Sequence, residues 1–200
     1  MPEYSGINHL ALVTPDMQST IRFWRDLLGL RLVVGLGSRG YKHYFFQISG
    51  QDLIAFFEWT GVERIPEKDH GVPVKGPFGF DHVSIGVQDL QGLWEIKGRL
   101  EAAGFWVSEV VDHGFIYSLY SFDPHNIPIE FSVQSPELDV RKSPCMADKS
   151  PCPAVLEGPE PQPGHWPQAG EPVEEDKLIF PGEGKELKEA AARGWPGAKA

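Results

Sequence analysis

The sequence predicts an α+β fold of two tandem βαβββ modules followed by a Pro-rich C-terminal tail. The first observation is an internal repeat, because INHLALVTPDM at residues 7–17 matches FDHVSIGVQDL at residues 80–90 with an offset of 73. The second is a change of composition near residue 135, since 11 of the 18 prolines fall in residues 136–200. Together they divide the chain into a repeated, periodic body and a tail.

Each copy of the repeat opens with a strand and continues into an amphipathic helix. The opening strands are expected at residues 7–13 and 80–87. Apolar residues then recur at three- and four-residue spacing in IRFWRDLLG and LWEIKGRLEAAG. Each helix is expected to begin after an Asp N-cap and to end at a Gly, which are Asp16 and Gly29 in one copy and Asp89 and Gly104 in the other.

Three short strands close each copy. They are rich in β-branched and aromatic residues and are separated by Gly, Asp or Pro turns. The expected strands are residues 31–36, 41–48, 52–59, 105–111, 115–122 and 127–133. Residues 60–79 contain Gly and Pro and are expected to form a linking loop. The modules are therefore predicted at residues 5–59 and 79–134, within a domain of residues 1–135.

Residues 136–200 are expected to form an extended tail with one short helix near residues 185–193. Large apolar side chains are too scattered there for a separate core, and they are Leu156, Trp166, Leu178, Ile179, Phe180 and Trp195. The two cysteines, Cys145 and Cys152, both lie in this Pro-rich stretch, which excludes a disulfide framework for the fold.

Composition excludes several classes of partner. Against 28 acidic residues there are only 18 Lys and Arg, and the net charge of −10 leaves no basic surface for a phosphate backbone. No apolar run approaches the roughly 20 residues of a membrane span, and MPEYSGINHL lacks the features of a signal peptide. A cytoplasmic protein that binds neither nucleic acid nor membrane is expected.

The repeat places ionisable residues at matching points. His9 and His82 occupy the same position of the opening strands, and Glu58 and Glu130 follow them by 49 and 48 residues on the closing strands. Imidazole and carboxylate together suit Fe(II), Mn(II), Ni(II) or Zn(II). A single strand His is more commonly a structural residue. Recurrence of the His and Glu at matched spacing instead favours a divalent metal site.

These two segments, together with YSFDPHNIPIEF at residues 120–131, resemble the vicinal-oxygen-chelate superfamily. That superfamily includes glyoxalase I, methylmalonyl-CoA epimerase, fosfomycin-resistance proteins and type I extradiol dioxygenases, and the resemblance covers about residues 5–134. It implies that the paired modules form a metal-centred cup that binds two neighbouring oxygens of a small-molecule substrate. It also implies a homodimer, because members of this length often share modules between chains. The site would then either combine ligands from two chains or form a closed cup within one chain.

One pattern within the superfamily is glyoxalase-like. By resemblance, His9, Glu58, His82 and Glu130 would be four ligands of Ni(II) or Zn(II), which would act as a Lewis acid on an enediolate while a ligand carboxylate moves the proton. The strand at residues 52–59 can also be aligned so that Phe56 faces the metal, and Glu58 would then be a surface charge.

The other pattern resembles the extradiol dioxygenase signature, which runs from a His through a Tyr and an Asp-Pro to a ligand Glu. VDHGFIYSLYSFDPHNIPIE at residues 111–130 supplies His113, Tyr120 and Glu130 at these points. Asn126 stands where the signature has Gly or Pro, and Asn tolerates the left-handed turn conformation. A structural role remains open, because Tyr120 also fits a half-buried strand aromatic and Asp-Pro is a common turn.

The extradiol resemblance implies that His9, His82 and Glu130 form a two-His-one-carboxylate triad on Fe(II), leaving three positions for a catecholate and O₂. Tyr120 would hydrogen-bond the substrate and His113 would assist proton movement. Aromatic strands with few basic residues favour a planar aromatic substrate over a glutathione adduct. The leading interpretation is a ring-cleaving dioxygenase, the second a glyoxalase- or epimerase-type enzyme, and the third a metal-independent binding or resistance protein.

Overall fold

The structure is a computed structural model and describes residues 6–38, 40–76, 80–151, 153–162, 164, 170, 178–182 and 184–196. Contacts divide the chain into two compact units, Met1–Pro144 and Cys145–Ala200. Trp166 and Cys152 of the predicted tail, and residue 79 at the predicted start of the second module, lie outside the described residues.

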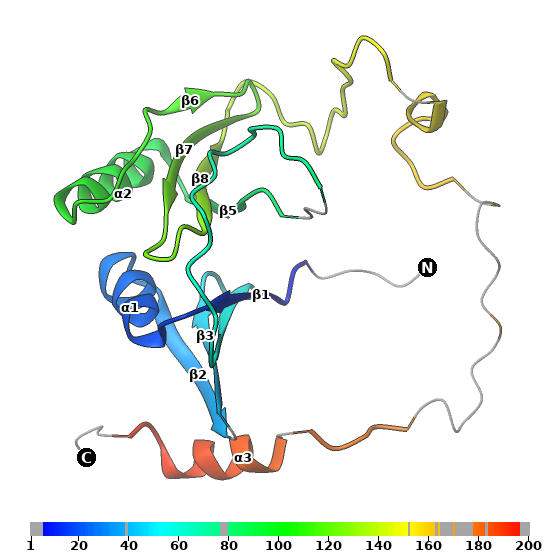
Figure 1. Cartoon of the computed structure of the whole chain (residues 1–200). Helices are drawn as coiled ribbons and strands as arrows, with labels where there is room; N and C mark the ends of the chain where they lie inside the picture. Colours follow the sequence, from blue (N-terminus) through cyan, green and yellow to red (C-terminus); the bar gives the residue numbers. More distant parts are fainter. Residues whose placement is uncertain are drawn as a thin grey trace. The chain divides into compact units, whose positions relative to one another are not determined.

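The first module contains one four-stranded sheet (Figure 1). Its elements are β1 (His9–Thr14), α1 (Met17–Ile21), the π-helical segment η1 (Arg22–Leu27), β2 (Arg31–Ser38), β3 (Tyr41–Gln47) and β4 (Leu53–Trp59). The strand order is β1-β4-β3-β2, in which β1 runs parallel to β4 and the other neighbours are antiparallel.

The second module repeats this arrangement. Its elements are β5 (Val83–Gly86), α2 (Leu90–Ala102), β6 (Val111–Asp112), β7 (Ile116–Phe122) and β8 (Pro128–Gln134). The strand order is β5-β8-β7-β6, again with the first pair parallel and the others antiparallel. The predicted α+β fold of two tandem βαβββ modules is therefore confirmed.

The helix boundaries follow the capping residues of the sequence. Asp16 accepts a hydrogen bond from the Gln18 backbone N–H, and Asp89 accepts one from Gly92, so both are N-caps. The first helix widens after one turn, because the N–H of Leu28 donates to the carbonyl of Phe23, five residues earlier, at 3.0 Å. The helices end before Gly29 and Gly104, which both adopt a φ of 80°.

The strand predicted at residues 105–111 is wrong for most of its length. Only β6 and an isolated bridge between Val107 and Ser121 pair with β7. Side chains replace the missing ladder bonds, because Ser108 Oγ accepts from the Tyr120 N–H at 2.9 Å and Ser121 Oγ donates to the Trp106 carbonyl at 2.7 Å. The segment therefore follows the sheet edge without completing a strand.

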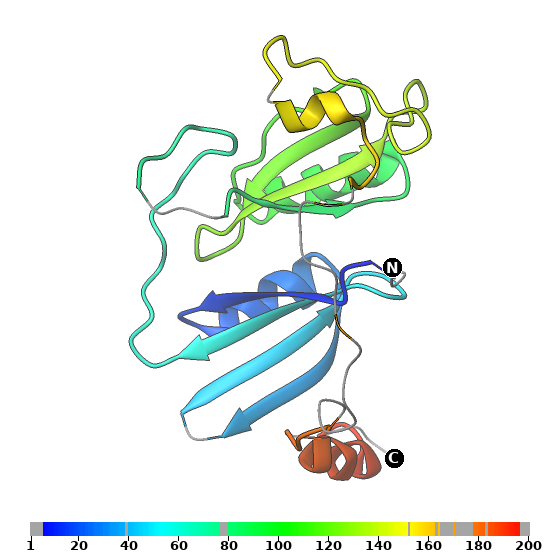
Figure 2. The ribbon, with the colours of Figure 1, turned by 90° about the vertical axis from the view of Figure 1, so that its right-hand side faces the viewer.

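Each helix covers one face of its own sheet (Figure 2). The buried core lies on these helix-facing sides and includes Trp24, Phe46, Phe56, Leu93, Leu100, Leu119, Ile129 and Phe131. Because side chains alternate along a strand, the neighbouring residues point to the opposite faces. Most of the candidate site residues lie on those opposite faces.

The second unit contains a 3₁₀ turn η2 (Pro153–Glu157) and α3 (Gly184–Arg193), which agrees with the helix predicted near residues 185–193. Neither element contains a buried residue. Leu178, Ile179 and Phe180 are exposed before α3. Among the described residues, no helix is long and apolar enough to cross a membrane.

Removing residues 145–200 is expected to leave a folded body. Both sheets and both module helices precede this point, and Gln134 Nε2 already donates to the Leu138 carbonyl inside the retained part. The unfolding temperature by circular dichroism should change by less than about 4 °C, the shift that about 1 kcal/mol produces. Failure of the truncated chain to fold would mean that the two modules need residues 145–200 to reach a stable structure.

Candidate metal and substrate site

A cavity of about 470 Å³ opens on the face of the second sheet that α2 does not cover, and it is lined by Asp69, His70, Gly71, His82, Trp106, His113 and Tyr120. The ladder explains why functional side chains gather there. Glu130 pairs with Ser84 on one side and with Tyr120 on the other, so the three side chains share a face. His82 shares that face because it lies two residues before Ser84.

The structure brings His82 and Glu130 together, with Nε2 of the imidazole 3.0 Å from Oε2 of the carboxylate. On the other side of the ring, Nδ1 lies 2.7 Å from Asp81 Oδ1. Asp81 is itself held by Lys68 Nζ at 2.6 Å and by the Gly71 N–H at 3.0 Å. The contacts with Lys68 and then His82 hold the pKa of Asp81 well below its ordinary range. A charged carboxylate thus orients Nε2 of His82 toward Glu130.

Glu130 is almost completely buried, with 4% of its surface exposed. Burial alone would raise the pKa of this carboxyl group, but the nearby hydroxyls of Ser118 and Ser84 and the His82 imidazole outweigh it. The pKa is therefore lowered from its ordinary value. Glu130 is ionised at neutral pH and available as an anionic oxygen donor.

The spacing of these two donors fits a divalent metal. Two ligands at about 2.1 Å from an ion and at right angles to each other lie about 3.0 Å apart. The observed separation of Nε2 and Oε2 is 3.0 Å. Within the described part of the chain, however, no three His, Cys, Asp or Glu side chains gather into a metal-binding group. The geometry of His82 and Glu130 therefore fits two adjacent ligand positions of a metal ion, and a complete site would need at least one further ligand.

His9 is not brought to this pair. It lies on β1, where its Nδ1 is 2.9 Å from Asn8 Oδ1 and its ring centroid is 5.5 Å from that of Phe45. It is exposed on the face of the first sheet that α1 leaves uncovered. The first sheet thus presents an imidazole of its own, separate from His82 and Glu130.

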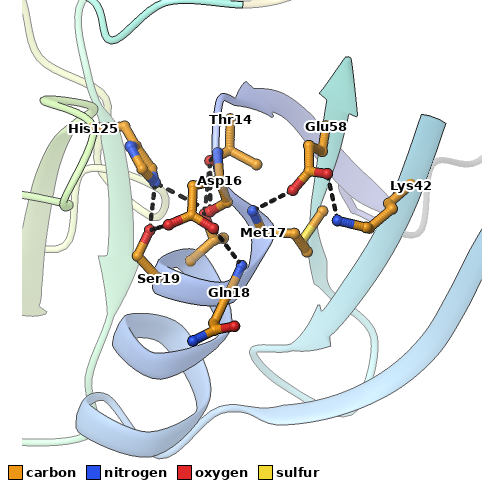
Figure 3. A network of polar contacts seen from close by, with 9 residues as sticks. Thr14, Asp16, Met17, Gln18, Ser19, Lys42, Glu58 and His125 are labelled. Carbon is orange, nitrogen blue, oxygen red and sulfur yellow. Dashed lines mark hydrogen bonds and ion pairs between the residues drawn. The ribbon is translucent and has the colours of Figure 1, made fainter. Parts of the chain in front are cut away.

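Glu58 lies on the opposite face of the first sheet from His9. It pairs with Thr14 at the far end of the β1–β4 ladder. Its Oε2 accepts a hydrogen bond from the Met17 backbone N–H at 2.6 Å, and its Oε1 forms an ion pair with Lys42 (Figure 3). The alternative alignment through Phe56 also leads to this face, because the Phe56 ring packs 5.2 Å from Trp24 in the core.

The first sheet has no carboxylate at the position that corresponds to Glu130. Glu130 lies two residues beyond the position that faces His82 across the β5–β8 ladder. In the first sheet His9 faces Leu53, and the residue two positions further along is Ala55, which is fully buried. A methyl group cannot bind a metal, so the internal repeat is incomplete at this point.

Tyr120 and His113 lie together at the cavity, with the Tyr120 hydroxyl 2.8 Å from His113 Nε2. Tyr120 also contacts His82 edge-on, at a centroid distance of 6.0 Å. Burial, and then the charge of Glu130, raise the pKa of Tyr120 above its ordinary value. The phenol is therefore a protonated donor at neutral pH, close to the potential metal ligands.

His70 is a cavity residue to which sequence reasoning gave no role. Its Nε2 lies 3.1 Å from the Ile129 carbonyl, which only accepts, so Nε2 carries a proton. Its ring is 4.7 Å from that of Tyr120 and 5.7 Å from that of His82. Burial, and then the charge of His82, lower the pKa of His70. The neutral ring presents Nδ1 as an acceptor. A His between Asp and Gly in a loop has no periodic signal that would reveal this role.

The uncovered face of the first sheet is aromatic. His43 stacks on Phe57 with centroids 3.5 Å apart and planes at 13°, and Phe57 stacks on Trp59 at 5.2 Å and 11°. Phe45 contacts both His43 and His9. Trp59 is 44% exposed. These contacts define an aromatic face, which consists of His9, Tyr41, His43, Phe45, Phe57 and Trp59.

The first helix contacts the second module. His125, in the turn between β7 and β8, places Nε2 3.1 Å from Ser19 Oγ and 3.2 Å from the Asp16 carbonyl (Figure 3). Phe23 packs edge-on against Phe105 at 4.8 Å. The helix of the first module is thereby fixed to the second.

Comparison with known proteins identifies the fold. A sequence profile of the Glyoxalase/Bleomycin resistance protein/Dioxygenase superfamily matches residues 6–131. The chain belongs to this superfamily. The resemblance inferred from the repeated segments is thus confirmed, and the tail lies outside the matched region.

Relatives in the superfamily include MhqE of Bacillus subtilis (strain 168), whose name assigns it provisionally to the ring-cleaving dioxygenases. The match is 30% identical over 110 residues and spans 52% of this chain but only 33% of MhqE. A glyoxylase/bleomycin resistance protein/dioxygenase domain from Frankia sp. EAN1pec has the same fold, with a TM-score of 0.57 and 22% identity over 66% of this chain and 100% of that domain.

A variant of the fosfomycin resistance protein FosX from Listeria monocytogenes is similar in fold as well. Its structure contains Mn(II) and 1S,2S-dihydroxypropylphosphonic acid. The TM-score is 0.52 with 20% identity, over 70% of this chain and 98% of FosX. In that structure, a protein of this fold thus contains a divalent metal and a small molecule with two neighbouring hydroxyl groups.

Proposed function

We propose that the protein is an Fe(II)-dependent extradiol-type dioxygenase that cleaves an ortho-dihydroxylated aromatic ring. The proposal depends on Ala55, which occupies in the first sheet the position that Glu130 occupies in the second. The first sheet therefore supplies no carboxylate at this position. The two modules together then offer two imidazoles and one carboxylate, which is the ligand set of Fe(II) oxygenases with open positions. Glu58 is left out of the set because its two oxygens bond Met17 and Lys42.

The third ligand in this proposal is His9 of the partner subunit in a homodimer. Within one chain, His9 is exposed on the aromatic face, whereas His82 lines the cavity of the second sheet and Glu130 lies next to His82. A two-fold axis would place the aromatic face of each copy over the cavity of the other and generate two equal sites. The exposed Trp59 of the aromatic face, and the exposed Val13 that pairs with Phe57 of that face, would then become buried.

The residues around the cavity suit the chemistry of a diphenol. His82 and Glu130, with the partner's His9, would hold Fe(II), which would supply the activation of O₂ for ring cleavage. Tyr120 would donate a hydrogen bond to one substrate oxygen, and His113, in contact with the same hydroxyl, would relay a proton. His70 would accept the proton that the substrate releases, through Nδ1. The reaction adds both atoms of O₂ to the diphenol and breaks one carbon–carbon bond of the ring, so no external reductant is consumed.

Oxygen uptake with a panel of catechols tests the proposal, together with metal analysis of protein purified without added metal. Iron and catechol-dependent uptake support it. The glyoxalase-type alternative requires a fourth ligand, so metal loss in Glu58→Gln with no oxygen uptake from any catechol would reject the proposal in its favour. Full binding of a substrate without any metal would favour the third class, a metal-independent binding protein.

Tyr120→Phe is expected to retain iron but lower turnover by roughly 10²-fold, the usual loss for one hydrogen bond to developing charge. The change removes the hydroxyl that contacts His113 and leaves His82 and Glu130 in place. Oxygen uptake and iron content are measured on the same preparation. Tyr117→Phe, on the same strand, provides the control. Unchanged turnover in Tyr120→Phe would leave this tyrosine with a structural role only.

A further inference from the structure

We infer that the site selects uncharged aromatic diols and rejects those with an anionic group remote from the chelating oxygens. Asp69 and Trp106 are the residues that determine this specificity. The inference rests on the proposed function and names its substrate class. It follows from the negative charge of the cavity, from the aromatic wall that Trp106 provides, and from the aromatic rings that the opposing sheet would add.

The charge at the cavity mouth is negative. Asp69 is exposed and lines the cavity, and none of the described lining residues is Lys or Arg. The neighbouring Lys68 does not offset it, because Nζ of Lys68 lies 2.6 Å from Asp81 Oδ2, behind His82. A carboxylate or phosphonate on the substrate would therefore meet Asp69 without a cation to receive it.

The interior of the cavity is also unfavourable for anions remote from the metal position. The carboxylates of Glu130 and Asp81 lie 3.0 and 2.7 Å from the two ring nitrogens of His82, and the His82 ring contacts Tyr120. An anionic substituent next to Tyr120 would be repelled by these two carboxylates. Only the oxygens that chelate the metal would escape it, because there the ion supplies positive charge.

Trp106 provides a flat apolar wall for an aromatic ring. Its side chain is 56% exposed, and its ring lies 5.7 Å from that of Phe122. The backbone beneath it is fixed by the Ser121 hydroxyl and the Val107 bridge. An exposed indole on a fixed backbone loses little conformational entropy when a ligand ring packs against it.

The opposing sheet adds aromatic rings rather than cations near the metal position. Lys42 of β3 lies on the helix-facing side, where it pairs with Glu58. Arg31 of β2 lies on the same side as His9, but three strand spacings away, which is about 14 Å. A single-ring diol that chelates next to His9 does not reach that far. Arg31 is nevertheless the cation through which an anion could bind, and the experiment includes it.

Anaerobic calorimetry of the Fe(II)-loaded full-length protein tests the inference with two isosteric ligands. These ligands, 3,4-dihydroxybenzamide and 3,4-dihydroxybenzoate, share the diol and differ in charge. The amide is expected to bind at least about tenfold more tightly. Asp69→Asn should strengthen benzoate binding and so reduce the ratio of amide affinity to benzoate affinity severalfold. Glu95→Gln, which removes an exposed carboxylate from α2 outside the cavity lining, should leave the ratio unchanged.

Trp106→Ala should weaken the binding of both ligands by about tenfold. The control is Trp94→Ala, which removes an exposed Trp from α2 and should leave the binding of both ligands unchanged. Three results would overturn the inference but not the proposed function. The benzoate could bind as tightly as the amide or more tightly, or Asp69→Asn could leave the ratio of the two affinities unchanged. The third is a selective loss of benzoate binding in Arg31→Gln. If neither diol binds the wild-type protein, the proposed function fails and the inference fails with it.

Discussion

Glu130→Gln is expected to lower metal affinity by more than about 100-fold and to abolish oxygen uptake. The substitution keeps the size of the side chain but removes the anionic donor that lies 3.0 Å from His82 Nε2. His82→Ala should have the same effect, because only one of the two donors then remains on the second sheet. Metal content is measured by elemental analysis after dialysis against a weak chelator.

Glu58→Gln is the matched control, since it removes a carboxylate from the corresponding closing strand of the first module. Metal content should be unchanged. The variant should instead lose about 1 kcal/mol of stability, because Glu58 accepts the Met17 N–H at the helix N-terminus. Full metal occupancy in Glu130→Gln or His82→Ala would contradict the proposed ligand set.

Mixing two inactive variants is expected to restore activity if His9 acts in the partner subunit. His9→Ala and His82→Ala homodimers would each lack a ligand in both sites. In a mixed dimer, one site would lose both residues and the other would have a complete set. Random assortment should therefore recover about a quarter of wild-type oxygen uptake per chain, because half of the dimers are mixed and half of their sites are intact.

Co-expression of the two variants with different affinity tags allows the mixed dimer to be isolated. Its metal content should be one ion per dimer, and each homodimer should contain almost none. A double variant, His9→Ala with His82→Ala in the same chain, mixed with the wild type provides the control. No recovery in the mixed dimer, with activity only in wild-type chains, would mean that each site forms within one chain.

The sequence predicted the pairing of His82 with Glu130 but not the position of Glu58. Spacings of 48 and 49 residues look equivalent along the chain, yet a strand presents alternate residues to opposite faces. The β1–β4 ladder places Glu58 beside Thr14, on the helix side of the sheet. The spacing from His to Glu along the chain includes the turns between strands as well as the paired strand residues. A difference of one residue in that spacing therefore moves the Glu side chain to the other face of the sheet.

The conformation of residues 105–111 and the position of His70 depend on contacts between segments distant in the sequence, which a local sequence pattern does not reveal. The aromatic segment at residues 105–111 has strand composition, but most of its ladder is replaced by two side-chain hydrogen bonds, in which the Ser108 hydroxyl accepts and the Ser121 hydroxyl donates. His70 belongs to a linker, and only its bond to the Ile129 carbonyl and its packing against Tyr120 give it a defined position. The repeated strands and capped helices were predictable because their signals are periodic or local.

Asn126 has a consequence for the linker that contains His70. Among the described residues it is the one non-glycine with a positive φ, at 67°. A Gly would adopt that turn without the roughly 1 kcal/mol of strain, but it could not accept from Arg64 Nη2 at 2.7 Å or donate to the Ile65 carbonyl at 2.8 Å. The linker is thus tethered at its start by Asn126 and further along by His70. Much of the conformational entropy of the linker is therefore lost during folding. The binding of a ligand in the cavity then costs less entropy, because the linker is already ordered.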